Sequence, residues 1–365
     1  MADESTAARD EGRRRRPRSR RRKALLVAAW TAVGLVVVGG SGLGYLYAKL
    51  NGNISGVDIN AALGGDRPAD PDNGSMDILV LGSDSRAGSN GEYGKDEGSS
   101  RSDTAMIVHV YKGHKRASVV SIPRDTLVTR PDCKTDKGSE AAGGRDQMFN
   151  TAYQVGGPAC AVKTVEAMSG IRMDHYLEVD FTGFKKLVDT LGGVDITTSK
   201  RIDDDKSHLH LAPGPHTLGG EQALGLVRTR HGVGDGSDLG RIQLQQAFIK
   251  ALIGQVEQVG LFSDPKKLYD LADTATSALT TDSDLDSVRS LAGFAGGLKG
   301  IGADHIDMVT LPVRYDPADP NRVLPQDRQA RQVWDALRAD RTIPASATKD
   351  SAGDKGDAKD VVAGR

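Results

Sequence analysis

The most constraining feature of this 365-residue chain is a run of 25 residues, Ala24 to Ala48, without one charged side chain. At about 1.5 Å per residue, a helix of this length exceeds the roughly 30 Å hydrocarbon core of a bilayer. Residues 1–23 carry ten Lys and Arg against four acids. Since positive segments stay inside, we predict a basic cytoplasmic segment at 1–23, a transmembrane helix at 24–48 and an extracytoplasmic remainder.

Two alternatives compete for this N-terminal region. A cleaved signal peptide usually has a shorter apolar region of ~7 to 15 residues and a small-residue cleavage site, which Tyr45-Leu46-Tyr47 does not resemble. The arginine run is also typical of arms that bind nucleic acid, but the adjacent membrane helix explains it more simply. We therefore predict a single-pass membrane protein without a nucleic-acid partner.

The composition changes again on either side of the central region. Residues 49–75 are rich in Gly, Asn, Asp and Pro, which predicts an extracytoplasmic linker. Residues 341–365 consist mainly of Ala, Asp, Lys and Gly and predict a disordered tail. Residues 76–340 lie between them and are long enough to form one domain with a substantial core.

Apolar runs and helical patterns alternate in this domain. Runs rich in Val and Ile and bounded by turn residues predict strands at 76–82, 104–111, 117–123, 175–179 and 304–312. Amphipathic patterns with capping residues predict helices at 159–169, 181–191, 243–259, 283–296 and 326–338. Strands separated by helices indicate the α/β class, and we expect an α/β/α sandwich around a central mixed sheet.

The two cysteines, Cys133 and Cys160, both follow the predicted membrane helix. An even pair in an oxidising compartment favours a disulfide, which would close a loop of about 27 residues. A metal site is less well supported because no histidine lies between or near the pair. Two buried free thiols are the remaining alternative.

Arginine and aspartate recur in close pairs where predicted strands or helices begin or end. The pairs are Asp84/Arg86, Arg101/Asp103, Arg124/Asp125, Arg228/Arg230 and Asp238/Arg241. The arginine fork suits phosphate, and a carboxylate beside it can hold a divalent metal that also touches the phosphate. The pattern predicts a site for a phosphate-bearing ligand.

Two of these carboxylates are candidate metal ligands. If the first two strands pair antiparallel, Asp84 at the end of one lies beside Asp103 at the start of the next, and they could share Mg²⁺. The alternative is that Asp84 is a turn residue and Asp103 a strand cap.

Further along, Arg228 and Arg230 end a short helix, and a glycine-rich loop leads to Arg241 and Gln245 on one face of a helix start. These residues predict a phosphate clamp. Arginines at helix ends can also be partners of the helix dipole.

Seven segments, in this order, resemble the LytR-CpsA-Psr family of cell-envelope ligases. They are VLGSDSR, RSDTAMIVHV, VSIPRDTLV, FNTAYQVGGPACAVKTVE, DHYLEVDFTGFKKLVDTLGGVDI, LGGEQALGLVRTRH and DLGRIQLQQAFIKAL. They cover roughly Asp77 to Leu252. The composition and the cysteine pair resemble an actinobacterial member.

The resemblance implies a phosphotransferase, dependent on Mg²⁺ or Mn²⁺, that attaches a glycopolymer from a polyprenyl-pyrophosphate carrier to peptidoglycan through a phosphodiester bond. The prenyl chain is then expected in an apolar tunnel of the domain. By this resemblance the metal ligands are Asp84 and Asp103. The implied pyrophosphate ligands are Arg101, Arg124, Arg228, Arg230, Arg241 and Gln245. The implied catalytic residues are Arg124, Arg228, Arg230, Asp238 and Arg241.

Several alternatives stay open on the same residues. Water in place of the acceptor hydroxyl would make the protein a polyprenyl-pyrophosphate phosphatase. Binding without chemistry would make it an envelope lipid sensor or regulator. Asp125 and Asp238 are the candidates for a general base, and the leaving polyprenyl phosphate is an alternative proton acceptor.

Overall fold

The computed structural model describes residues 42–83, 102–135, 138–231, 233, 236–259, 264–354 and 361–364. The chain divides into two units, residues 1–49 and 50–365. In the first unit, residues 42–49 are helical. The membrane helix predicted at 24–48 lies mostly outside the described residues, and no helix within them has the length and apolar character to cross a membrane.

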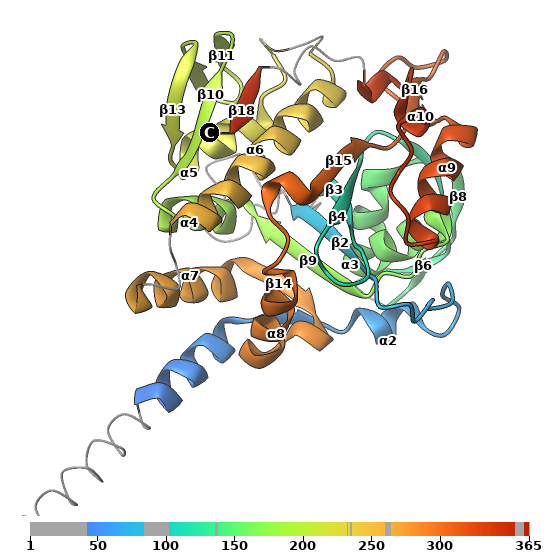
Figure 1. Ribbon diagram of the computed structural model, residues 1–365. Coiled ribbons are helices and arrows are strands. Elements are labelled where there is room, and N and C mark those ends of the chain that lie inside the picture. The colour runs from blue at the N-terminus through green and yellow to red at the C-terminus, as the bar shows by residue number, and fades with distance from the viewer. Residues whose placement is uncertain are drawn as a thin grey trace, which may run out of the picture. The chain divides into compact units, whose positions relative to one another are not determined.

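The second unit is built on a sheet of seven strands in the order β1-β14-β9-β2-β3-β4-β15 (Figure 1). Their bounds are β1 Ser55–Val57, β14 Leu279–Asp282, β9 His175–Asp180, β2 Met76–Ser83, β3 Ser102–Val110, β4 Ala117–Ile122 and β15 Ile306–Thr310. β2, β3 and β4 pair antiparallel, whereas β2 pairs with β9 and β4 with β15 in parallel. The prediction of an α/β fold with a central mixed sheet is confirmed.

Helices cover both faces of this sheet. The longer helices are α3 Phe149–Ser169, α4 Phe181–Thr190, α5 Gly220–Arg228, α6 Asp238–Gln258, α7 Pro265–Ala278, α8 Val288–Leu298 and α9 Asp327–Arg338. Because side chains alternate along a strand, Leu79 and Ile107 face a core shared with α3 and α9. Ile78 and Met106 face the other way, against side chains of α6 and α8.

A smaller sheet packs on α6 and forms a second core. It consists of β13 Gly214–Leu218, β10 Val194–Thr198 and β18 Val362–Gly364, and the hairpin β11 Ile202–Asp204 and β12 Leu209–Leu211 lies next to it in the chain. The prediction of a disordered tail at 341–365 is wrong where β18 forms. Val361 and Val362 are each 3% exposed and belong to this second core, together with Phe248 of α6. Because most residues of the tail are polar or small, its composition did not predict that this apolar pair is buried.

The predicted linker, residues 49–75, is also partly structured. β1 pairs with β14, and the short helix α2 Ile59–Leu63 inserts Ile59 and Leu63 into the main core. Arg67 then forms a buried ion pair with Glu166 of α3, with 2.6 Å between Nη2 and Oε1. These contacts hold residues 55–67 against the domain.

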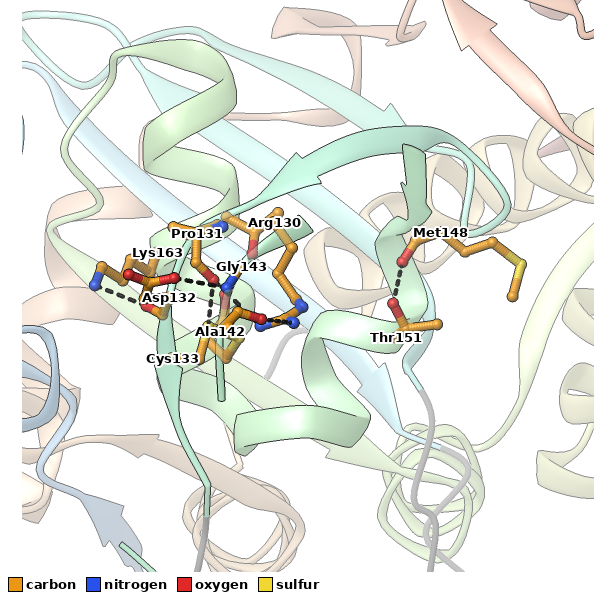
Figure 2. Close-up of a disulfide and its surroundings, with 11 residues drawn as sticks. Arg130, Pro131, Asp132, Cys133, Ala142, Gly143, Met148, Thr151 and Lys163 are labelled. Atoms are coloured by element: carbon orange, nitrogen blue, oxygen red, sulfur yellow. Dashed lines mark hydrogen bonds between the residues drawn. A yellow bond between two sulfur atoms is a disulfide. The ribbon is translucent and has the colours of Figure 1, made fainter. Parts of the chain in front are cut away.

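A disulfide joins Cys133 and Cys160, with 5.5 Å between their Cα atoms, as predicted (Figure 2). It links α3 to the ribbons β5 Leu127–Arg130 with β8 Gly144–Met148, and β6 Cys133–Lys134 with β7 Glu140–Ala141. Asp132 strengthens the link, because its carbonyl accepts from Lys163 Nζ of α3 at 2.8 Å. The segment after β4 is therefore fastened to α3.

The remaining elements are short. They are the hairpin β16 Val313–Tyr315 with β17 Val323–Pro325, the helix α10 Ala345–Thr348, and the 3₁₀ turns η3 Ser283–Leu285, η4 Ala303–His305 and η5 Ala352–Asp354.

Candidate active site

The start of β3 and the end of β4 bring the first two functional side chains together. Ala105 of β3 pairs with Ile122 of β4, so Asp103 lies beside the turn that follows β4. Pro123 ends that strand, and Arg124 leaves it toward Asp103. Arg124 Nη1 donates a hydrogen bond to Asp103 Oδ1.

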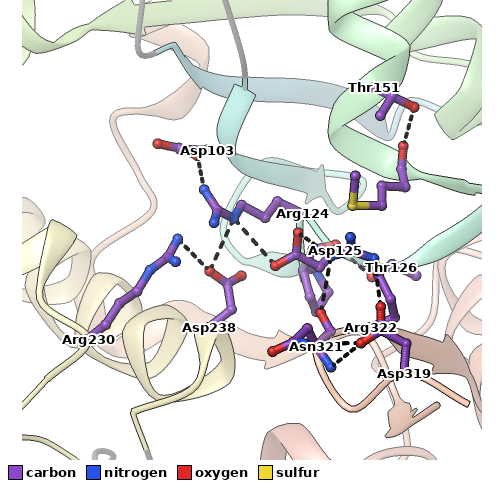
Figure 3. Close-up of polar contacts among 12 residues, drawn as sticks. Asp103, Arg124, Asp125, Thr126, Thr151, Arg230, Asp238, Asp319, Asn321 and Arg322 are labelled. Carbon is purple, nitrogen blue, oxygen red and sulfur yellow. Dashed lines mark hydrogen bonds and ion pairs between the residues drawn. The ribbon is translucent and has the colours of Figure 1, made fainter. Parts of the chain in front are cut away.

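Asp238, at the N-terminus of α6, gathers three guanidinium groups (Figure 3 shows two of them). Its Oδ1 lies 2.5 Å from Arg241 Nη2, 3.3 Å from Arg230 Nη2 and 3.6 Å from Arg124 Nε. The Asp238 side chain is only 12% exposed. One carboxylate thus spaces arginines that come from the turn after β4, from the segment after α5 and from α6.

Two further residues of α6 tie this helix to β3. Arg241 Nη2 donates to the carbonyl of Asp103 at 2.9 Å. Gln245 Nε2 donates to Thr104 Oγ1 at 3.1 Å and to the carbonyl of Val227 at 2.9 Å. Gln245, which was expected to reach a phosphate oxygen, therefore holds β3, α5 and α6 together.

Arg228 takes a different position from Arg230. Its guanidinium carbon lies 4.9 Å from the centre of the Phe181 ring at the start of α4, a cation–π contact. Arg228 and Arg230 nevertheless line the same cavity. Three other predicted residues, Asp84, Arg86 and Arg101, lie outside the described part of the chain.

Asp204 is a positioning residue that the sequence reading missed. The acidic run at 203–205 looks like a solvated turn, but Asp204 is only 2% exposed. Its Oδ2 accepts from the backbone N–H groups of Arg230 and His231, both at 2.9 Å. Burial alone would raise the pKa of this carboxyl, but these two backbone donors, with those of Lys206 and Ser207, hold it below its usual value.

The charges of the cluster favour an anionic ligand. Burial opposes ionisation of Asp103, yet Arg241 and Arg124 hold the pKa of Asp103 below its ordinary value. Burial lowers the pKa of Arg230, and the positive charges of Arg241 and Arg124 lower it further. A bound anion would relieve the repulsion among these guanidinium groups.

A cavity of about 580 Å³ runs from this cluster between β2, β3, α4 and α6. Asp103, Arg228, Arg230 and Arg241 line it where the charges gather. Most of its other lining is apolar and includes Val80, Met106, Val108, Phe184, Leu187 and Leu252. Its shape and lining suit a ligand with a long apolar chain and an anionic head.

Among the described residues, one group of three metal-binding side chains gathers closely, Asp203, Asp205 and His210 of the β11–β12 hairpin. All three are exposed. The predicted metal ligand Asp103 is not part of this group.

Comparison with known proteins decides the family. The LytR_cpsA_psr family matches residues 46–339. The chain belongs to this family. The resemblance carried by the seven sequence segments is therefore confirmed.

Individual relatives agree with this assignment. The cell wall biosynthesis protein LcpA of Corynebacterium glutamicum is 32% identical over 316 residues, which cover 79% of this chain and 59% of that protein. The polyisoprenyl-teichoic acid–peptidoglycan teichoic acid transferase TagT of Bacillus subtilis is 32% identical over 303 residues, which cover 80% of this chain and 88% of that protein. A solved structure of TagT bound to LI-WTA is 27% identical, has a TM-score of 0.55 and covers 76% of this chain and 94% of that chain. The chain thus spans less than two thirds of LcpA.

Proposed function

We propose that this LytR_cpsA_psr family protein transfers a glycopolymer from a polyprenyl-pyrophosphate carrier to peptidoglycan. The observation that carries the proposal is an apolar cavity of about 580 Å³ that meets an arginine cluster. A prenyl chain would fill the apolar part, and the pyrophosphate would lie at Arg124, Arg230 and Arg241. The relative TagT is a polyisoprenyl-teichoic acid–peptidoglycan teichoic acid transferase, which supports this substrate class.

The arginines suit the charge that a pyrophosphate brings. Phosphoryl transfer needs charge neutralisation and positioning more than a covalent nucleophile. Asp238 is the carboxylate that Arg124, Arg230 and Arg241 share. A bound pyrophosphate would share the same three guanidinium groups, with Asp238 keeping their spacing.

In the proposed reaction, the acceptor hydroxyl oxygen attacks the phosphorus that carries the glycan. The bond from that phosphorus to the bridging oxygen breaks, and polyprenyl phosphate leaves with the electron pair. The hydroxyl proton passes to Asp125 or to the departing phosphate. Asp238 is the other candidate proton acceptor, and its carboxylate also sets the spacing of three guanidinium groups. The product is a phosphodiester.

Asp103 supports a proposed divalent metal, because its carboxylate has a lowered pKa and lines the cavity beside the arginine cluster. We propose that Asp103 and Asp84 hold Mg²⁺ or Mn²⁺. Mg²⁺ commonly takes one or two carboxylates together with substrate phosphates, whose charge it would help to neutralise. Arg101 is proposed as a further pyrophosphate ligand.

The location follows from the same proposal. Peptidoglycan lies outside the cell membrane, so the domain at 76–340 must be extracytoplasmic. We propose that residues 24–48 span the membrane once, with the basic segment 1–23 in the cytoplasm and 49–75 leading to the domain.

A transfer assay with the full-length protein in proteoliposomes tests the proposal. The substrates are a radiolabelled polyprenyl-pyrophosphate-linked saccharide, peptidoglycan oligomers and Mg²⁺. We expect label on the peptidoglycan with wild type and with the control Arg314→Ala, an exposed arginine that does not line the cavity. Arg230→Ala should lower the rate by about 100-fold, as loss of a transition-state donor commonly does.

Other outcomes would replace the proposal with an alternative. Release of the saccharide phosphate without transfer, in the presence of acceptor, would indicate a phosphatase. Tight binding of the lipid without turnover would indicate a sensor.

A further inference from the structure

The β16–β17 hairpin, far from β4 in the chain, lies against the turn that carries Arg124 and Asp125. Val323 N donates to the carbonyl of Asp125 at 3.3 Å, and Thr126 forms a parallel bridge with Val323. Thr126 is fully buried. The hairpin therefore packs against the Asp125 side of the arginine cluster (Figure 3).

Asp125 is held between two guanidinium groups. Its Oδ2 lies 3.5 Å from Arg124 Nε, and its Oδ1 lies 3.8 Å from Arg322 Nη1 (Figure 3). Each carboxylate oxygen thus has its own cation. The second cation restricts rotation of the carboxylate, which a single ion pair with Arg124 would leave free.

Arg322 is itself oriented by its turn. Its backbone N–H donates to the carbonyl of Asp319 at 2.9 Å, and its Nε lies 3.7 Å from Asp319 Oδ2. Asp319 Oδ1 also accepts from the backbone N–H of Asn321 at 3.0 Å. The guanidinium therefore approaches Asp125 from a turn that is already closed by hydrogen bonds.

The orientation of Arg124 depends on this arrangement. Its Nε lies nearly midway between two carboxylates, at 3.5 Å from Asp125 and 3.6 Å from Asp238. Small movements of Asp125 would change which carboxylate attracts this edge of the guanidinium. A fixed Asp125 keeps Arg124 between them, with Nη1 bonded to Asp103.

We propose that Arg322 is a positioning residue: it holds Asp125 and, through Asp125, orients the guanidinium of Arg124 toward the pyrophosphate of the donor. This inference rests on the proposed function, because the pyrophosphate is the ligand that Arg124 would contact.

A double-mutant cycle on the full-length protein in detergent micelles tests the proposal. The probe is geranylgeranyl pyrophosphate, with binding measured by titration calorimetry. We expect Arg322→Ala to weaken binding by about five- to tenfold, the size of coupling found between contacting residues, and Arg322→Lys to weaken it less. In an Asp125→Asn background, Arg322→Ala should change the Kd by less than about twofold. The ion pair between the partly exposed Arg322 and Asp125 spans 3.8 Å and adds little to folding, so the variants should fold.

The matched control is Arg314→Ala, an exposed arginine on β16 of the same hairpin, which should bind as wild type does. An equal loss for Arg322→Ala in both backgrounds would mean that Arg322 contacts the ligand directly, and would overturn the proposal. Unchanged binding by Arg322→Ala in the wild-type background would also overturn it. If wild type fails to bind the probe or to transfer saccharide, the proposed function itself fails.

Discussion

Asp238 and Asp204 organise the arginines of this site in two different ways. Asp238 contacts guanidinium groups and sets their spacing. Asp204 instead accepts from the backbone of the segment that carries Arg230. Position along the sequence suggested the first role, since Asp238 precedes Arg241 by three residues at a helix start. Nothing in the sequence around Asp204 distinguishes it from its exposed neighbours.

Asp204→Ala should lower both stability and activity. It leaves the backbone N–H groups of Arg230 and His231 without their acceptor, at a cost of about 2 to 3 kcal/mol in the free energy of unfolding. Urea denaturation measures this change, and the transfer assay the loss of rate. The control is Asp205→Ala, because the Asp205 side chain is 99% exposed and should tolerate the change. Equal effects of both substitutions would contradict the positioning role.

The surroundings of His109 predict that the free energy of unfolding depends on pH. The fully buried ring lies between Asp77, at 2.8 Å from Nδ1, and Asp340, at 3.2 Å from Nε2. Burial alone would lower the pKa of His109, but these two carboxylates raise it above its usual value near 6.5. The folded state therefore binds the proton more strongly, so this stabilisation is complete below pH 6.5 and is lost as pH rises through the raised pKa.

The test compares unfolding free energies of wild type and His109→Gln at pH 6 and pH 9. We expect wild type to lose more stability across this range than the variant, because the variant lacks the titrating ring. Equal losses in the two proteins would show that His109 does not contribute. Burial also raises the pKa of Asp77, and His109 opposes that rise, so the variant tests His109 and Asp77 as a coupled pair.

At the scale of elements, the long apolar strands and helices are the parts that sequence patterns predicted well. β2, predicted at 76–82, occupies Met76–Ser83, and α9, predicted at 326–338, occupies Asp327–Arg338. α3 is longer than predicted, because it begins at Phe149 and continues across a kink at Gly156 and Gly157. The strands that escaped prediction are short, from two residues in β6 to five in β8, β10 and β13. The shortest of them cannot show a period, and pairing with another strand defines them.

The disulfide should stabilise the β5–β8 region against α3. For a sequence separation of 27 residues, the chain-entropy relation gives about 3 to 4 kcal/mol. The double variant Cys133→Ser/Cys160→Ser should lose about this much in urea denaturation. Wild type denatured in reducing agent serves as the control and should match the variant. A loss of less than about 1 kcal/mol would mean that the remaining contacts, such as that of Lys163 with Asp132, hold the segment.

At the scale of the whole molecule, the sheet, α4 and α6 together form the cavity. Blocking it should weaken the binding only of ligands that have an apolar chain. Leu252→Trp places a larger side chain in the lining. If the tryptophan displaces two or three CH₂ groups of the ligand's apolar chain, each worth about 0.8 kcal/mol, geranylgeranyl pyrophosphate should bind at least about tenfold more weakly. Binding of inorganic pyrophosphate should stay unchanged.

The control for this prediction lies one turn further along α6. Val256 is 39% exposed and does not line the cavity, so Val256→Trp should leave both affinities unchanged. Equal weakening of both ligands by Leu252→Trp would indicate a distorted arginine cluster instead of a blocked apolar chamber. Titration calorimetry distinguishes the two outcomes.

The sequence alone determined the α/β class and the family and favoured the disulfide, because apolar periodicity, ordered motifs and cysteine count are properties of the chain itself. It also identified Arg124, Arg230, Asp238 and Arg241, which the fold brings into one cluster.

Only the tertiary structure decided the contacts of Asp204 and Arg322, the ordered parts of the linker and tail, and the cavity. The physical reason is the same in each case. These features arise from contacts between segments far apart in the chain, and such contacts leave no local pattern in the residues that make them.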